Sequence, residues 1–488
     1  MEGNAMLKMT RCSITVIASL LLVFSYGSMH VVAQDAYEKA VLQVTTDSEE
    51  AEAHFWKGVF DADNVFFSRA ASHFEQAIAL DESFAMARFM HARWVPGLNQ
   101  AQRQEKMTEV LASLTTASTG ELLVATAIRE QFDGNTSEAR ALYEAASNMM
   151  PDDPRIAVGA ALTTGAGGSP ERTAALQQVT ETFPDYAAAH NTLAYQLWFT
   201  GDEAGAREAV KEYMKLVPEH PNSHDSYAEL FQFSGMFSEA VAHYSIAVKL
   251  DENYFQGYFG LAEAHALAGE TDKAREYLMR AKPFAPTAAG RNNLIRAEAN
   301  IYFLEGNIEK GIEVLKTAAR QFEADENSGL AAQAHRELAV AEAISGNRDY
   351  VQAHLDKALE FQDVNAAQHS WSAVAYGLSG NADAAEKSAS AFEEAVSGGA
   401  NNFVHTLKGL ALLVAGNPQK AEDELIRSGL QDPWSNAFMA WCQKEMDHEA
   451  EAEGFERNIM ADNQFTALNV GFSLARLSLT NVNKKFAQ

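Results

Sequence analysis

A spacing of 34 residues recurs through the middle of the chain. Three glycines stand 34 residues apart, at Gly201, Gly235 and Gly269. Each is followed five residues later by an alanine, and the first and last are followed seventeen residues later by a proline: Ala206, Ala240, Ala274, Pro218 and Pro286. Because a single helix and its turn would give this pattern only once, its recurrence in fixed register indicates a repeated structural unit. The spacing therefore predicts an array of similar units.

Length and composition agree with an extended array. The chain has 488 residues, which is more than one compact core usually holds, since domains typically contain about 100 to 200 residues. Hydrophobic residues make up 47% of the sequence and charged residues 21%. These values are ordinary for a folded protein and argue against extensive disorder.

Each unit is interpreted as two antiparallel helices. In the clearest unit the first helix begins near Ala187 as AAAHNTLAYQLWFT, Gly201 provides the turn, and AGAREAVKEYMKLV forms a second helix that ends before Pro218. Apolar residues three and four apart give the helical period, and a proline lacks the amide hydrogen that a continuing helix needs. The small Ala194 and Ala206 let the paired backbones approach closely.

This pattern resembles the tetratricopeptide repeat, a 34-residue helix-turn-helix unit whose second helix carries an alanine, a large apolar residue and a closing proline. Matching residues follow Gly58 and recur in second helices along the chain: Ala70, Phe74, Ala77, Ala139, Tyr143, Ala146, Pro151, Ala240, Tyr244, Ala247, Ala274, Ala281 and Pro286. Later units keep the turn glycine and part of the second helix, at Gly306, Gly346, Gly380 and Gly416. The tryptophan of the family's first helix is mostly replaced, by His190, His224 and Tyr258. The resemblance implies an all-α superhelical solenoid of about eleven units with C-terminal capping helices.

The regularity of the repeat changes along the chain. After a lead-in over residues 34–48, the units fit well over residues 49–287 and loosely over residues 288–433, where insertions occur near residues 290 and 325. This change allows a break into two sub-arrays near residue 288. Residues 434–488 are interpreted as capping helices and a polar tail, because a terminal unit needs a polar outer face.

The amino terminus, residues 1–33, has the features of a secretory signal peptide. Lys8 and Arg11 precede a run of eleven apolar residues, and Ala33 ends a small-residue cleavage site. The apolar run is shorter than the ~20 residues that span a bilayer. We therefore expect cleavage after Ala33 and a secreted or periplasmic protein without a membrane span. The alternative is a leader that is retained as an anchor.

The cysteines permit no internal disulfide after cleavage. The signal peptide contains Cys12, so the mature chain keeps Cys442 alone. Cys442 lies in the apolar sequence FMAWCQ, which favours a buried, unreactive thiol.

The sequence is strongly acidic, with 66 acidic and 38 basic residues and a formal net charge of −28. Removal of the leader, which contains Lys8, Arg11 and Glu2, would leave about −29. A surface of this sign repels phosphate backbones and attracts basic partners or cations. Nucleic-acid binding is therefore not expected.

The resemblance also implies where a partner would bind, because first helices in this family line a concave groove that takes an extended peptide or a helix. The family's groove positions fall on Asn191, Tyr195, Asp225, Glu229, Gln232, Phe259 and Glu263. Carboxylates there can pair with basic side chains, amides can bond a peptide backbone, and aromatic rings can anchor side chains. We therefore expect a non-enzymatic scaffold in the cell envelope that holds a protein or peptide, basic in character, in an acidic groove. The plainer interpretation is that these are solvated helix positions.

Glu229 and Glu263 also offer an alternative function. They occupy equivalent places in adjacent units, where helical layers lie ~8 to 10 Å apart, close to the ~6.5 to 9.5 Å that separates the carboxylates of inverting glycoside hydrolases. A soluble ligand-binding protein or unrecognised enzyme acting on a sugar or cation is therefore the alternative. No neighbouring residue indicates the tuned acid that such catalysis needs.

Two further motifs have simpler explanations than chemistry. His220 and His224 have the separation of metal ligands on a helix, but Pro221 stands between them at an expected helix start. The stretch TGAGGSPER lacks the Lys-Ser/Thr ending of a phosphate loop, and Ser169 before Pro170 fits a capped helix start. We predict no catalytic residue, no metal site and no cofactor.

Overall fold

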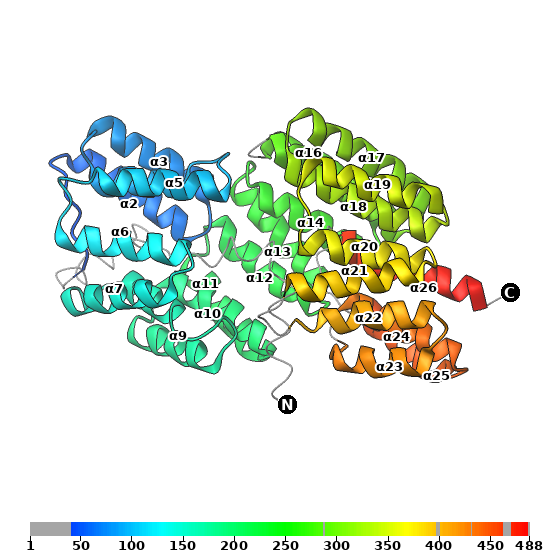
Figure 1. Ribbon diagram of the computed structural model, residues 1–488. Helices are drawn as coiled ribbons and strands as arrows, with labels where there is room; N and C mark the ends of the chain where they lie inside the picture. Colours follow the sequence, from blue (N-terminus) through cyan, green and yellow to red (C-terminus); the bar gives the residue numbers. More distant parts are fainter. Residues whose placement is uncertain (1–40, 286–287, 397–400, 431, 462–469, 487–488) are drawn as a thin grey trace. The chain divides into compact units, whose positions relative to one another are not determined.

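The computed structural model describes residues 41–285, 288–396, 401–430, 432–461 and 470–486. Within these ranges the chain forms 25 α-helices and no strand (Figure 1). The all-α repeat architecture predicted from the sequence is confirmed. The helices pair in order along the chain, and α24 and α25 add one more pair after the eleven units that the sequence predicts.

The chain is divided into two compact units. The N-terminal unit contains the described residues up to Leu230 together with residues 246–252, and the C-terminal unit contains residues 231–245 and the described residues from Asn253 onward. The chain thus passes from one unit to the other within α12 and α13, whereas the regularity of the repeat changes near residue 288. The two units are described separately below.

The helices of the first six pairs have the following bounds: α2 (Glu49–Asp63), α3 (Phe67–Leu80), α4 (Ala85–Trp94), α5 (Gln100–Ala112), α6 (Thr119–Phe132), α7 (Thr136–Met149), α8 (Pro154–Leu162), α9 (Pro170–Thr182), α10 (Ala187–Thr200), α11 (Glu203–Leu216), α12 (Pro221–Phe233) and α13 (Phe237–Leu250). The later helices are α14 (Phe255–Leu267), α15 (Thr271–Ala281), α16 (Ala288–Leu304), α17 (Ile308–Ala324), α18 (Ser328–Ser345), α19 (Arg348–Phe361), α20 (Ala366–Leu378), α21 (Ala382–Ala395), α22 (Phe403–Val414), α23 (Pro418–Arg427), α24 (Pro433–Glu445), α25 (Glu449–Ala461) and α26 (Val470–Phe486).

Glycine turns join the two helices of most repeats. Gly201 ends α10 with φ of 87°, in the left-handed region where a side chain would be strained. The turn glycines of other repeats have the same sign of φ: Gly134, Gly235, Gly269, Gly306, Gly346, Gly380 and Gly416. The first repeat differs, because Gly58 lies inside α2 and the turn uses Val65 with φ of 62°.

Small residues set the distance between helices. Ala194 and Ala206 are fully buried where α10 and α11 pack together, as the sequence predicts. In the C-terminal unit the buried ring of Tyr244 on α13 packs against Gly260 on α14, where an added Cβ would lie 2.2 Å from the ring atom Cε1. This large-to-small contact joins consecutive repeats.

Helix starts follow ordinary capping chemistry. The Ser169 hydroxyl accepts a hydrogen bond from the backbone N–H of Arg172, and Pro170 is the first residue of α9. The predicted capped start in TGAGGSPER is therefore confirmed. None of the helices in the described ranges is long and apolar enough to cross a membrane.

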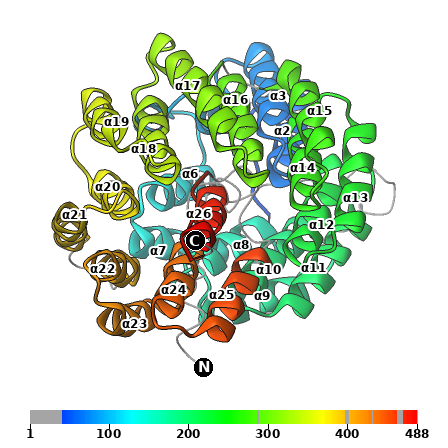
Figure 2. The same ribbon diagram turned by 90° about the vertical axis from the view of Figure 1, so that its right-hand side faces the viewer.

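In the C-terminal unit, the last helix packs against both late and early repeats. α26 contacts its neighbour α24 and also α16 and α18, which lie far earlier in the sequence. Figure 2 shows α16, α18 and α24 beside α26. Apolar residues of α26 join the same hydrophobic core as residues of α16 and α18.

Candidate peptide-binding surfaces

A segment without regular secondary structure, residues 41–47, lies on the N-terminal unit and is held by acidic side chains. The backbone N–H of Leu42 donates to Asp153 Oδ2 at 3.0 Å, and the backbone N–H of Thr45 donates to Glu121 Oε1 at 2.8 Å. The Thr46 hydroxyl donates to Asp81 Oδ2 at 2.6 Å. Glu121 and Asp153 lie at the starts of α6 and α8, in two consecutive repeats, and Asp81 follows the end of α3.

The spacing of these contacts matches the repeat. Leu42 and Thr45 are three residues apart, and three residues of extended chain span roughly 10 Å. Neighbouring helix layers are separated by about 8 to 10 Å. Leu42 and Thr45 thus place one backbone N–H at each of two neighbouring repeats, those that begin with α8 and α6.

The acceptors are held in place by local structure. Glu121 forms a capping box with Ser118 at the start of α6, and Asp153 accepts from the backbone N–H of Arg155 at the start of α8. Asp153 is also paired with the Arg155 guanidinium, at 2.5 Å between Oδ2 and Nη2. Although burial opposes the change, the Arg155 guanidinium lowers the pKa of Asp153. Asp153 is therefore charged at neutral pH and a strong acceptor.

The turn after α2 is buried against later repeats of the same unit. The Tyr186 hydroxyl donates to Asp63 Oδ2 at 3.2 Å, and the Tyr213 hydroxyl donates to Asn64 Oδ1 at 2.9 Å. Asp63 and Asn64 are only 1% and 2% exposed. Because these contacts join residues 123 and 149 positions apart, they close the first repeat onto the fifth.

The carboxyl of Asp63 has an unusual pKa. Burial raises its pKa well above the ordinary range, an effect that the nearby Arg155 only partly offsets. Burial of a carboxylate costs free energy unless it is fully paired. We therefore interpret Asp63 as a structural acceptor for Tyr186 that carries an electrostatic cost at neutral pH.

The groove residues predicted in the N-terminal unit lie close together on α10 and α12. The Tyr195 hydroxyl donates to Glu229 Oε2, and Asn191 and Tyr195 are both 7% exposed. Burial raises the pKa of Glu229, although the Tyr195 hydrogen bond opposes this change. Asp225 and Glu229 are half-buried. The Glu229 carboxyl is thus engaged by a neighbouring repeat.

The predicted residues of the C-terminal unit form a second small group. Gln232 is fully buried and Glu263 is 4% exposed, with 3.5 Å between Gln232 Nε2 and Glu263 Oε2. Phe259 is half-buried and stacks on Phe255 at 5.7 Å between ring centroids. Of this group, Phe259 presents the most accessible surface.

The two histidines near the start of α12 make separate contacts. His220 Nε2 lies 3.2 Å from Arg69 Nη2 and 3.8 Å from Asp61 Oδ1. His224 Nε2 lies 3.0 Å from the carbonyl oxygen of Pro218. Within the described ranges, no group of His, Cys, Asp and Glu side chains is arranged to hold a metal ion.

Cys442 is fully buried on α24, as the sequence predicts. Burial raises the pKa of its thiol to about 12. The Sγ donor contacts the carbonyl oxygen of Pro418 at 3.0 Å. Because the thiolate is the reactive form, Cys442 is unreactive at neutral pH.

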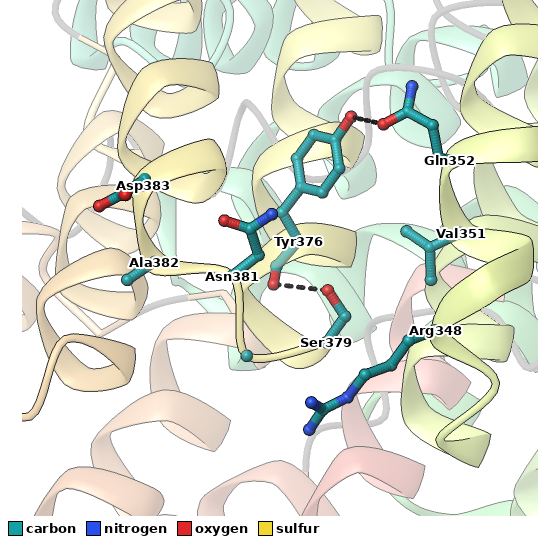
Figure 3. Close-up of a pocket in the computed structure, with 9 residues that line it drawn as sticks. Arg348, Val351, Gln352, Tyr376, Ser379, Asn381, Ala382 and Asp383 are labelled. Carbon is teal, nitrogen blue, oxygen red and sulfur yellow. Dashed lines mark hydrogen bonds between the residues drawn. The ribbon is translucent and has the colours of Figure 1, made fainter.

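A pocket of about 520 Å³ lies between neighbouring repeats of the C-terminal unit (Figure 3). Arg348, Val351 and Gln352 of α19 line one side, and Tyr376 and the turn before α21 line the other. The Tyr376 hydroxyl donates to Gln352 Oε1 at 2.5 Å across this pocket. None of the predicted groove residues lines it, and its charged side chains do not converge on one point.

The C-terminal unit also binds a helix of its own. On α26, Val470, Leu474 and Leu477 are 0%, 0% and 5% exposed, and Ser473 and Ser478, on either side of this stripe, are also buried. The Arg476 guanidinium donates to the carbonyl oxygens of Ile459 and Met460 at 3.1 and 3.0 Å, near the end of α25.

A family model described as tetratricopeptide repeat matches residues 228–289. The chain contains tetratricopeptide repeats in this part of the array, in agreement with the resemblance that its sequence shows. No curated protein matches this tetratricopeptide repeat protein in sequence. Proteins of this family are generally non-enzymatic scaffolds that bind protein partners.

Solved structures similar to this tetratricopeptide repeat protein share little sequence with it. The human IFIT1 dimer with PPP-AAAA is 14% identical, with a TM-score of 0.42, covering 85% of this chain and 99% of that one. The Cut9-Hcn1 hetero-tetramer of APC/C is 14% identical, with a TM-score of 0.40, covering 82% and 76%. The thermophilic repeat protein TTC0263 of Thermus thermophilus is 18% identical, with a TM-score of 0.31, covering 35% and 93%.

The segment at residues 41–47 and the inward position of α26 were not predicted from the sequence. The acceptors Glu121 and Asp153 were visible only as helix-start residues, in SxxE and before a proline. Nothing in that pattern indicates that they also bind another part of the chain.

Proposed function

We propose that this tetratricopeptide repeat protein is a non-enzymatic scaffold of the cell envelope that holds an extended peptide or a helix of a partner protein. The observation that carries this proposal is the binding of residues 41–47 by carboxylates of consecutive repeats. The array thereby recognises backbone N–H groups at the spacing of its own units. This mode of recognition needs no particular peptide sequence, so side-chain contacts elsewhere would supply specificity.

The acidic character of the array supports a basic partner. The chain carries a net charge of −28, which steers oppositely charged proteins toward it. Asp225 and Phe259 are the predicted groove residues with exposed surface and different chemistry, a carboxylate and an aromatic ring. A lysine or arginine of a partner fits Asp225 in the N-terminal unit, and an apolar side chain fits Phe259 in the C-terminal unit.

The envelope location rests on the signal peptide proposed for residues 1–33. It is tested by determining the amino-terminal residue of protein isolated from cells. A chain that begins at Gln34 supports export and cleavage, whereas an intact Met1 contradicts cleavage.

The scaffold role is tested by crosslinked capture from native envelope extract, with quantification of each captured protein. The full mature chain is compared with Asp225→Asn and Phe259→Ala. The matched controls are Glu252→Gln and Met279→Ala, because Glu252 is exposed and Met279 is 69% exposed.

We expect a specific protein whose capture falls about tenfold in at least one groove variant, the effect of losing roughly 1.4 kcal/mol. The same protein should be captured normally by both controls. Equal capture by all five proteins, or no specific capture at all, contradicts the proposal.

A further inference from the structure

The C-terminal unit contains a helix-binding face that its own last helix occupies. A cap that only shields the final repeat would contact α24 and α25. α26 contacts α24 and the end of α25 and also packs on α16 and α18, which lie far earlier in the sequence (Figure 2). Val470, Leu474 and Leu477 are spaced four and three residues apart, which places them on one stripe of the helix. All three belong to the hydrophobic core shared with α16 and α18.

A stretch of α18 is buried on every side. Leu338, Ala339, Val340 and Ala341 are consecutive and fully buried, so every side of this part of the helix is covered. Helices α17, α19 and α20 are neighbours of α18 in the array and contact it. α26, which lies much later in the sequence, contacts α18 as well. Removal of α26 would therefore expose apolar surface on first helices of this unit.

The charge of α26 differs from that of the array. Residues 470–486 contain Arg476, Lys484 and Lys485 and no acidic residue, whereas the whole chain has 66 acidic and 38 basic residues. A basic helix with an apolar stripe is therefore complementary to an acidic array in both respects. Small residues among the buried ones, Ser473, Ala475 and Ser478, let the helix approach its neighbours closely.

From these contacts we propose that α26 occupies a docking site for a partner helix of the same chemistry, with an apolar i, i+4, i+7 stripe, small residues beside it and net positive charge. The partner helix and α26 compete for α16, α18 and α24. This inference rests on the proposed scaffold function, for which it names the class of partner. It also means that the apparent affinity of this face for a partner helix falls as the fraction of molecules with α26 bound there rises.

The inference is tested with a fluorescein-labelled peptide of residues 470–488, whose binding to the full-length protein is followed by fluorescence anisotropy. The test protein is the double variant Leu474→Glu, Leu477→Glu, which places two carboxylates where α26 meets the core and displaces the helix. The matched control is Met279→Glu, Ile426→Glu, because these residues are 69% and 58% exposed and the change in charge is the same.

The double variant should bind the peptide at least about tenfold more tightly than the wild type and the control, because its site is free. A peptide with glutamate at positions 476, 484 and 485 should bind it about tenfold more weakly at low salt, if charge complementarity contributes. Equal binding of the unaltered peptide by wild type and double variant, or no binding by a double variant that keeps its cooperative unfolding, overturns the inference.

If the double variant loses cooperative unfolding, Arg476→Ala replaces it, since that change removes only the hydrogen bonds to the end of α25. Tighter peptide binding than wild type then supports the inference, and unchanged binding overturns it. If the capture experiment finds a specific partner but the peptide-binding experiment overturns the inference, the scaffold function is retained and α26 does not mark the partner's binding site.

Discussion

Single side chains determine how closely consecutive repeats pack. A Cβ on Gly260 would lie 2.2 Å from Tyr244 Cε1, and the Tyr244 ring is only 2% exposed and has little room to move. Gly260→Ala should therefore lower the free energy of unfolding by about 1 to 3 kcal/mol, the usual cost of overpacking. Urea denaturation followed by circular dichroism measures the change.

Gly329→Ala is the control for this substitution, because the nearest atom to its added Cβ is Asn327 Oδ1 at 4.0 Å. It should leave stability unchanged or raise it by up to about 1 kcal/mol, through helix propensity. Equal effects of the two substitutions would show that the Tyr244 contact is not what restricts position 260.

Asp63 gives the N-terminal unit a predictable dependence on pH. Burial raises its pKa in the folded state, so the folded protein binds its proton more tightly than the unfolded chain. Stability is then lost as pH rises from about 4 through the raised pKa. Asp63→Asn keeps an acceptor for the Tyr186 hydroxyl and removes the titration.

Asp63→Asn should raise the free energy of unfolding by on the order of 1 to 3 kcal/mol at pH 8 and by less at pH 5. Urea denaturation at the two pH values tests this, with the exposed Asp363→Asn as control. A stabilisation that is the same at both pH values would contradict the assigned cause, and destabilisation at pH 8 would show that the Asp63 charge is needed.

At the level of elements, a buried ion pair joins α16 to α18. Arg296 Nε donates to Glu337 Oε2 at 2.7 Å, and the guanidinium makes a second contact with Oε1 of the same carboxylate. Glu337 is fully buried and also accepts from Gln333. Removal of one partner leaves the other charge buried without compensation.

Arg296→Met and Glu337→Leu should each cost about 3 to 5 kcal/mol, and the double variant should recover most of that loss. A double-mutant cycle from denaturation curves measures the coupling. Lys310→Met serves as control, because the Lys310–Glu313 pair is 43% and 69% exposed and is worth at most about 1 kcal/mol. Additive single losses would exclude the pair as the coupling between these helices.

Most elements could be predicted from the sequence because their signals are local. The bounds of α10, the turn at Gly201 and the capped start of α9 each depend on residues within one repeat. The position of α26 depends instead on how the first helices α16, α18 and α24 converge once the repeats of the C-terminal unit have stacked. The periodicity of α26 predicts a helix but contains no information about which earlier helices it contacts.

At the scale of the molecule, the contacts of the candidate site could not be predicted from local sequence either. The seven groove residues follow from register alone, so the sequence could place them on first helices. The structure adds that the Tyr195 hydroxyl bonds Glu229 and that Asp63 meets Tyr186 across 123 residues. Contacts of that kind depend on superhelical pitch, which small per-repeat rotations determine.

The net charge affects the molecule as a whole. With 66 acidic and 38 basic residues, like charges repel across the folded surface and are less crowded in the unfolded chain. The Debye length falls from about 30 Å at 0.01 M salt to about 8 Å at 0.15 M. Added salt should therefore screen this repulsion before it weakens ion pairs at contact distance.

Raising sodium chloride from about 20 to about 200 mM at pH 8 should increase the melting temperature by roughly 1 °C for each kcal/mol of repulsion screened, because the unfolding entropy of a chain of 488 residues is about 1 kcal/mol/K. At pH 5, close to the isoelectric point of about 4.9, the net charge is small and the same salt should change the melting temperature little. Scanning calorimetry at both pH values measures the difference. A melting temperature that falls with salt at pH 8 would mean that attractive ion pairs, rather than the net negative charge, dominate the electrostatics of the array.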